Sequence, residues 1–118
     1  MRQIDPRRAA IAHEVQELLP QAARVYDAWR ADAPQGASLP PATKRRLARR
    51  VARDASPGFG IAEIMLIVQA IAIAIAIYER FFRDSPSFRA AANPDNHGDF
   101  TGQSLVSSAV SEVMGEAS

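Results

Sequence analysis

The apolar run from Ile61 to Tyr78 constrains the fold of this chain more than any other feature. Its sequence is IAEIMLIVQAIAIAIAIY, in which only Glu63 and Gln69 are clearly polar. At about 100° per residue, its large aliphatic side chains point all round a helix axis, which is typical of a helix that is buried on every side or immersed in lipid. The residues that carry this pattern are Ile64, Ile67, Val68, Ile71, Ile73, Ile75 and Ile77. The pattern therefore excludes an ordinary helix on the surface of a soluble protein.

The alternation of isoleucine and alanine in this run also suits a buried strand, because isoleucine is β-branched. The run is longer than an ordinary strand, however, contains no glycine or proline, and continues into helix-forming residues as far as Arg83. We therefore expect a helix. At a rise of about 1.5 Å per residue it extends roughly 27 Å, just short of a hydrocarbon core of about 30 Å.

The residues on either side of the run favour a membrane span. Phe59 precedes it, and aromatic residues at its other end suit the membrane interface. Six basic residues lie within about 20 positions before the run, whereas only three arginines follow it closely. This bias predicts a cytoplasmic N-terminus. The alternative is a helix buried between the subunits of a soluble particle, in which Glu63 and Gln69 find hydrogen-bonding partners.

A basic helix is predicted over residues 41–55. Leu47 and Val51 form its narrow apolar face, and the opposite side carries Arg45, Arg46, Arg49, Arg50 and Arg53. Such a helix suits an anionic lipid surface, an acidic protein or the phosphates of nucleic acid, the last without sequence specificity because no aromatic residues are interleaved. Its position just before the apolar run favours lipid among these partners. A solvated face without a partner is the alternative.

The N-terminal region is predicted to be a helix that starts near Asp5 and Pro6. Apolar residues recur along it at steps of three and four positions, including Ile11, Val15, Leu18, Val25 and Trp29. This seam suits either the core of the same chain or contact between copies. Pro20 lies inside the pattern and removes a backbone donor, so we expect a kink or a break there.

The C-terminal arm, residues 84–118, begins with a segment rich in turn-forming residues. Within it, the sequence Asp95-Asn96-His97-Gly98-Asp99 is interpreted as a turn, because it lacks the spacing of a calcium-binding loop. A short amphipathic helix that needs a partner surface is predicted from the helical spacing of Leu105, Val106, Ala109, Val110, Val113 and Met114.

The sequence as a whole predicts an all-α chain with an N-terminal helical region (1–57), an apolar helix (58–83) and the C-terminal arm (84–118). The 118 residues include 14 basic and 13 acidic side chains and no cysteine. No catalytic, cofactor-binding or metal-binding motif is found, so no cofactor is expected. The preferred function is a non-enzymatic, single-span structural or assembly subunit of a larger complex. The alternatives are a soluble component of a phage virion or secretion apparatus and, less favoured, a nonspecific nucleic-acid binder. Either homo-oligomerisation or a multi-protein complex is expected.

Overall fold

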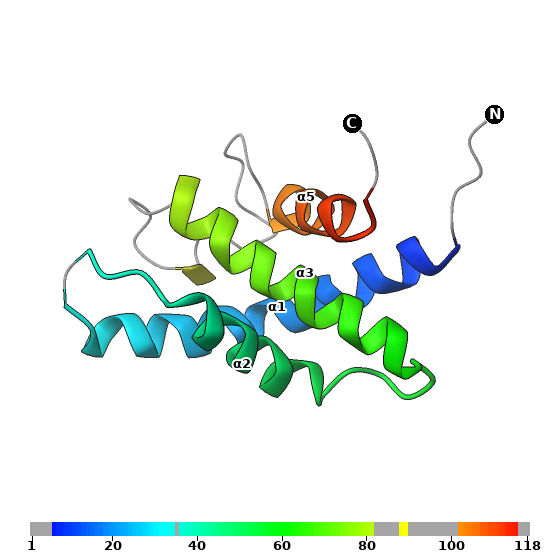
Figure 1. Ribbon diagram of the computed structural model, residues 1–118, viewed down its shortest axis with the longest axis horizontal. Helices are drawn as coiled ribbons and strands as arrows, with labels where there is room; N and C mark the ends of the chain where they lie inside the picture. Colours follow the sequence, from blue (N-terminus) through cyan, green and yellow to red (C-terminus); the bar gives the residue numbers. More distant parts are fainter. Residues whose placement is uncertain (1–5, 35, 82–87, 90–101, 116–118) are drawn as a thin grey trace.

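The structure, a computed structural model, describes residues 6–34, 36–81, 88–89 and 102–115. Over these residues the chain is all-helical and contains no strand, which confirms the predicted fold class. The helices are α1 (Pro6–Asp32), α2 (Pro41–Ala52), α3 (Ile61–Phe81) and α5 (Gly102–Val113), drawn in Figure 1. The predicted apolar helix is therefore present as α3.

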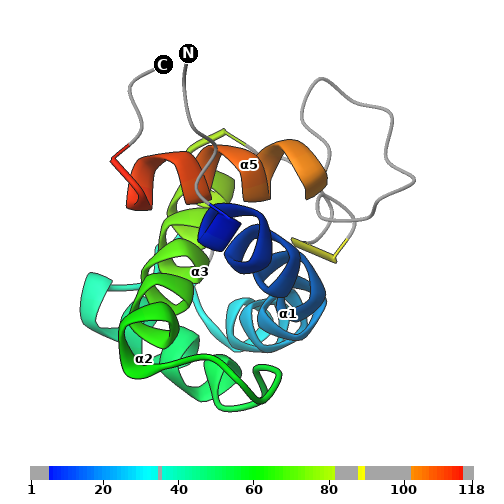
Figure 2. The ribbon, with the colours of Figure 1, turned by 90° about the vertical axis from the view of Figure 1, so that its right-hand side faces the viewer.

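α3 lies at the centre of the bundle and packs against α1, α2 and α5. Figure 2 shows α5 on one side of α3, α1 on a second and α2 on a third. One stripe of α3 is fully buried and consists of Ile67, Ala70, Ile71, Ala74, Ile75 and Tyr78. These residues recur at the spacing of a single helical face, and the alanines among them allow neighbouring backbones to approach closely.

α1 supplies the largest share of the remaining core. Its buried apolar residues are Ile11, Val15, Leu18, Leu19, Ala22, Ala23 and Tyr26. The predicted seam is thus displaced toward Leu19 and Tyr26, which flank it, and two of its residues, Val25 and Trp29, are only partly buried. The apolar surface of α1 packs within the same chain, so a second copy is not needed to cover Ile11 and Val15.

α1 continues through Pro20 without a break, contrary to one of the two outcomes expected there. Pro20 is exposed, and so is Gln16, whose carbonyl loses its helical hydrogen bond because proline has no N–H. On the solvent side of a helix, water satisfies that carbonyl. Proline is therefore tolerated at this position, whereas on the buried face it would leave an unpaired polar group in the core.

α2 and α5 are amphipathic helices that bury one face each. α2 buries Leu47, Ala48, Val51 and Ala52, and α5 buries Leu105, Val106, Ala109 and Val110. Gly115 follows α5 with a φ of 69°, a left-handed conformation that terminates helices and favours glycine. The surface that the C-terminal helix needs is thus provided by α3 and α1 of the same chain.

A buried carboxylate ties α1 to the connection between α2 and α3. Glu14 is 5% exposed, and its Oε2 accepts hydrogen bonds from the backbone N–H and the hydroxyl of Ser56, at 2.8 and 3.2 Å. Nearby, the side-chain amide of Gln21 donates to Asp54 at 2.8 Å. A buried carboxylate needs hydrogen-bond donors, and Ser56 supplies two of them. The contact therefore holds the connection that leads into α3 against α1.

Two isoleucines at different places on α3 provide a matched test of this packing. Ile71 is 0% exposed and Ile61 is 83% exposed. We expect Ile71→Ala to lower the free energy of unfolding by about 3 kcal/mol, because it leaves a cavity among α1, α3 and their neighbours. Ile61→Ala should change it by less than about 0.5 kcal/mol. Urea denaturation followed by circular dichroism measures both, and equal effects would contradict the arrangement.

Candidate interaction surface

One side of α3, between α2 and α5, is covered by no described helix (Figure 2). Its residues are exposed or half-buried and are here called the open face: Ala62, Met65, Gln69, Ala72, Ile73 and Ala76. Met65 is 57% exposed, and Gln69 is the one polar member. Contiguous apolar surface of this kind commonly marks an interaction site on a soluble protein.

The arginines predicted to lie on one side of the basic helix are all exposed; four lie in α2 and Arg53 caps its C-terminus: Arg45, Arg46, Arg49, Arg50 and Arg53. They do not form a single row toward α3. Arg45 and Arg49, one turn apart, lie on the edge of α2 that borders α3. Helical geometry places Arg46, Arg50 and Arg53 further round the helix, away from that edge. The basic side of α2 therefore has two parts with different neighbours.

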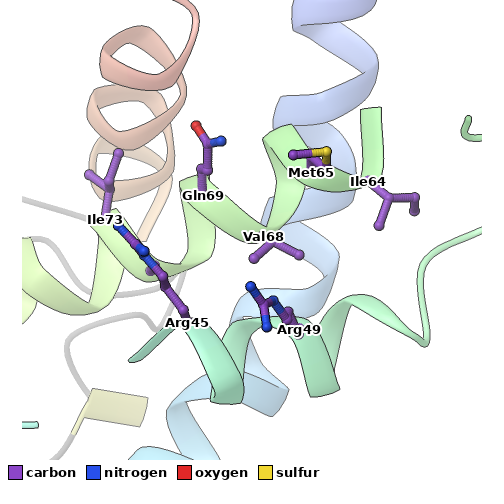
Figure 3. A pocket seen from close by; sticks show the side chains of 8 residues that line it. Arg45, Arg49, Ile64, Met65, Val68, Gln69 and Ile73 are labelled. Carbon is purple, nitrogen blue, oxygen red and sulfur yellow. The ribbon is translucent and has the colours of Figure 1, made fainter. Parts of the chain in front are cut away.

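A groove with a volume of about 730 Å³ runs between α2 and α3. Arg45 and Arg49 line it from α2, and the residues that line it from α3 are Ile64, Met65, Val68, Gln69, Ala72 and Ile73. Figure 3 shows both arginine side chains extending from α2 toward α3, with Val68 pointing back toward α2. The open face of α3 and the inner arginines of α2 are thus parts of one surface.

The groove is positively charged because Arg45 and Arg49 line it and none of the described residues that line it is acidic. Within the described part of the chain, neither Arg45 nor Arg49 forms a hydrogen bond or an ion pair. Lys44, their neighbour in sequence, has a different environment. Its Nζ lies 2.7 Å from Oε1 of Glu79, and the two side chains are only 17% and 8% exposed. Lys44 is therefore part of the interior, whereas the two arginines are available to a ligand or partner.

The carboxylate of Glu79 joins α3 to three other parts of the chain. Besides Lys44 on α2, it accepts hydrogen bonds at Oε2 from the Tyr26 hydroxyl of α1, at 3.0 Å, and from the backbone N–H of Leu39, at 2.9 Å. A buried ion pair is favourable only when its geometry is good and its remaining polar atoms are satisfied. These contacts hold α2 beside α3 and so set the width of the groove.

An aromatic cluster surrounds this carboxylate. The rings of Tyr26 and Tyr78 meet edge to face, with centroids 5.3 Å apart, and Phe88 packs 4.3 Å from Tyr78. Arg30 donates to the Tyr78 hydroxyl at 2.8 Å, and Asp27 accepts from the backbone N–H of Phe88 at 2.8 Å. Burial raises the pKa of the Tyr26 phenol above its ordinary value, and the nearby Glu79 carboxylate raises it further. Burial also raises the pKa of Tyr78, although Arg30 opposes the effect.

The residues predicted to face lipid or a protein interior fall into two groups. Ile67, Ile71 and Ile75 are 0% exposed and belong to the core stripe of α3. The other four are partly buried and lie outside that stripe: Ile64, Val68, Ile73 and Ile77. Both groups consist of large aliphatic residues, so the sequence does not distinguish them. They differ in burial because α1, α2 and α5 pack against only part of the surface of α3.

The remaining polar side chains that could take part in chemistry have ordinary positions or lie outside the described residues. His13 lies 3.7 Å from Glu17 on an exposed part of α1. Glu63 lies at the start of α3 beside Gly60, where an added Cβ would come within 2.9 Å of its Oε2. Residues 95–99 fall outside the described part of the chain. Among the described residues, no group of side chains has the arrangement of a metal site.

The Glu79 cluster is the feature that sequence reasoning missed. In the sequence, Glu79 is the first charged residue after the apolar run, and nothing in its immediate surroundings marks it as buried. Its partners Tyr26 and Leu39 lie 53 and 40 residues away, so no local spacing connects them. A single lysine among five arginines of the basic helix is the one available signal, because lysine is a compact point charge that suits a single buried carboxylate.

Neutralising the buried carboxylate should destabilise the fold. Glu79→Gln keeps the shape of the side chain but leaves the Lys44 ammonium without a counter-charge, at a cost of about 3 kcal/mol in the free energy of unfolding. Adding Lys44→Met should restore part of this loss, because the unpaired charge is then removed as well. Glu17→Gln, in an exposed pair, should change stability by less than about 0.5 kcal/mol. Equal effects of the two glutamate substitutions in urea denaturation would contradict the assignment.

The raised tyrosine pKa values predict a loss of stability at high pH. Both tyrosines of the chain are in the cluster, so every phenol reports on it. Since their folded pKa lies above the unfolded value of 10.0, their contribution to stability is complete below that pH and is lost as the pH rises through the folded pKa. We expect tyrosinate absorbance near 295 nm to appear only with unfolding. Titration of half the phenols near pH 10 in a fully helical protein would contradict this.

Comparisons of the chain with protein-family models, with curated proteins and with solved structures find no significant match. The features that bear on its function are those of the chain itself. They are the open face of α3, the inner arginines Arg45 and Arg49, and the groove between them. The Glu79 cluster sets their relative position.

Proposed function

We propose that this chain is a soluble, non-enzymatic assembly subunit that binds another protein through the open face of α3. The observation that carries the proposal is that α3 is apolar on every side but is covered by described helices on only three. Burial of apolar surface contributes about 25 cal/mol per Å². Covering the open face with a partner is therefore favourable, and the exposed arginines beside it provide charged contacts at the rim.

The position of α2 supports a protein environment for α3 over a lipid one. α2 packs along α3 and carries four exposed arginines, and a fifth, Arg53, follows its last residue. If α3 entered the bilayer with α2 attached, each arginine near the centre would cost about 2.5 to 3.5 kcal/mol. Detaching α2 instead would break the Lys44–Glu79 ion pair and expose Leu47 and Val51. Of the two environments that the sequence left open, the packing favours the interior of a soluble assembly.

The second candidate is a single-span membrane subunit, and the observation in its favour is the length of α3. The helix has 21 residues and is long and apolar enough to cross a membrane, and 33% of its most apolar stretch is buried in the bundle. In this candidate α1, α2 and α5 leave α3 when it inserts. The basic residues of α2 would then keep the N-terminus on the cytoplasmic side.

Fractionation without detergent separates the two candidates. We expect the expressed full-length chain to remain in the supernatant after ultracentrifugation and to unfold cooperatively in urea, because its core is completed by its own helices. Recovery mainly in a membrane pellet that resists carbonate extraction would overturn the soluble proposal and favour the single span.

A substitution on the open face sharpens this comparison. Ile73 is half-buried on the open face, so Ile73→Arg should leave the soluble protein folded and its solubility unchanged. In a membrane span the same change lies near the centre and should oppose insertion by about 3 kcal/mol. Gln16→Arg, on the exposed side of α1, is the matched control and should have no effect in either case. Loss of membrane-bound protein with Ile73→Arg alone would contradict the soluble proposal.

A further inference from the structure

We infer that the groove between α2 and α3 binds an acidic amphipathic helix of a partner protein. The inference rests on the proposed function and specifies the chemistry of the partner. The groove follows α3 from Ile64 to Ile73, which is roughly 14 Å or about two and a half helical turns. Its floor is apolar and includes Val68 and the small residue Ala72, which allows a second backbone to approach. This length and character suit the apolar stripe of one short helix.

The charge of the groove selects for an acidic partner. Arg45 and Arg49 are one turn apart, about 6 Å along the axis of α2, which matches the spacing of carboxylates at positions i and i+4 on a facing helix. Guanidinium groups bind carboxylates in a two-pronged geometry, and such charge-assisted hydrogen bonds are stronger than neutral ones. Gln69, on the open face, can exchange hydrogen bonds with a polar residue at the edge of the partner.

A second copy of the chain is a poorer occupant. Two grooves facing each other would bring the inner arginines of both copies together, and none of the described residues that line either groove is an acid that could offset them. Among the described helices, α1 and α5 carry both acids and an apolar face, but those faces are already buried within the chain. Glu79 is engaged by Lys44, Tyr26 and Leu39 and is not available to a neighbour.

A flat lipid surface would contact other arginines than the two that line the groove. Arg46 and Arg50 lie on the outer side of α2, away from α3, and would meet a membrane plane without involving Val68 or Ala72. Substitution of the inner pair and of the outer pair therefore distinguishes a helix in the groove from anionic headgroups. The two pairs are chemically identical and share one helix, so each is the control for the other.

The test uses the full-length chain and three fluorescent peptides of about 16 residues, each held helical by a side-chain staple so that ordering costs are small. All carry the same stripe of leucine and alanine, flanked by Glu, Gln or Lys. We expect the Glu peptide to bind about tenfold more tightly than the Gln peptide and the Lys peptide not to bind, as measured by fluorescence anisotropy. Raising the NaCl concentration from about 50 to about 500 mM should weaken the binding of the Glu peptide, because salt screens the charges.

Substitutions then locate the binding site. The double substitution Arg45→Gln and Arg49→Gln should lower the affinity for the Glu peptide by about tenfold, because two charge-assisted contacts are lost. Arg46→Gln with Arg50→Gln should change it by less than about twofold. Met65→Gln should remove the apolar contacts of this side chain and lower the affinity for the Glu peptide by a few-fold. Glu17→Gln, outside the groove, should leave that affinity unchanged.

Three results overturn the inference. The first is equal binding of the Glu peptide by the two double-arginine variants. The second is no binding of any peptide up to about 1 mM by chain that is soluble and folded. The third is that the chain binds phosphatidylserine vesicles but none of the peptides. That result would assign the arginines to binding of anionic lipid. In the second case the detergent-free solubility of the chain still supports the proposed function, so failure of the inference and failure of that proposal give different results.

Discussion

The structure depends on the need to cover a central helix that has no polar side. Every other described helix is amphipathic and places its apolar face on α3 or on a helix that touches it. The buried stripe of α3 alternates isoleucine with alanine, so large side chains fill the spaces between helices while small ones set the distance between backbones. The arrangement of α1, α2 and α5 follows from this one requirement, and among the described residues three helices leave one side of α3 uncovered.

Two buried carboxylates give the bundle its register, which apolar contacts alone specify poorly. Glu14 binds Ser56 before α3 begins, and Glu79 binds three groups where α3 nears its end. Leucine and isoleucine tolerate small shifts of one helix along another, but a buried carboxylate must meet particular donors. The first site joins α1 to the connection that leads into α3, and the second joins α1 to the far end of α3 through Tyr26, so both ends of α3 are positioned relative to α1.

Much of the fold could be predicted from local patterns. The helices at the apolar run, at the basic segment and near the C-terminus follow from periodicity, capping and composition, which act within a few turns of chain. The covered sides of α3 could not be predicted, because isoleucines surround its axis and give every side the same preference. The groove could not be foreseen either. It depends on the contact of Glu79 with Lys44, and that contact joins two segments whose separation in sequence carries no periodic signal. Pro20 is an intermediate case, since its effect on α1 depends on which side of the helix faces water.

The order of the helices along the chain also affects how the protein is made. α3 leaves the ribosome before α5, which covers one of its sides and meets the start of α1 through the bond from Arg8 to Ser111. Until α5 has been synthesised, α3 exposes this side as well as its open face. A nascent chain that pauses before Gly102 therefore exposes a continuous aliphatic surface, and transiently exposed surface of this kind is prone to aggregation and is bound by chaperones. Docking of α5 is therefore the step that removes this side of α3 from contact with other molecules.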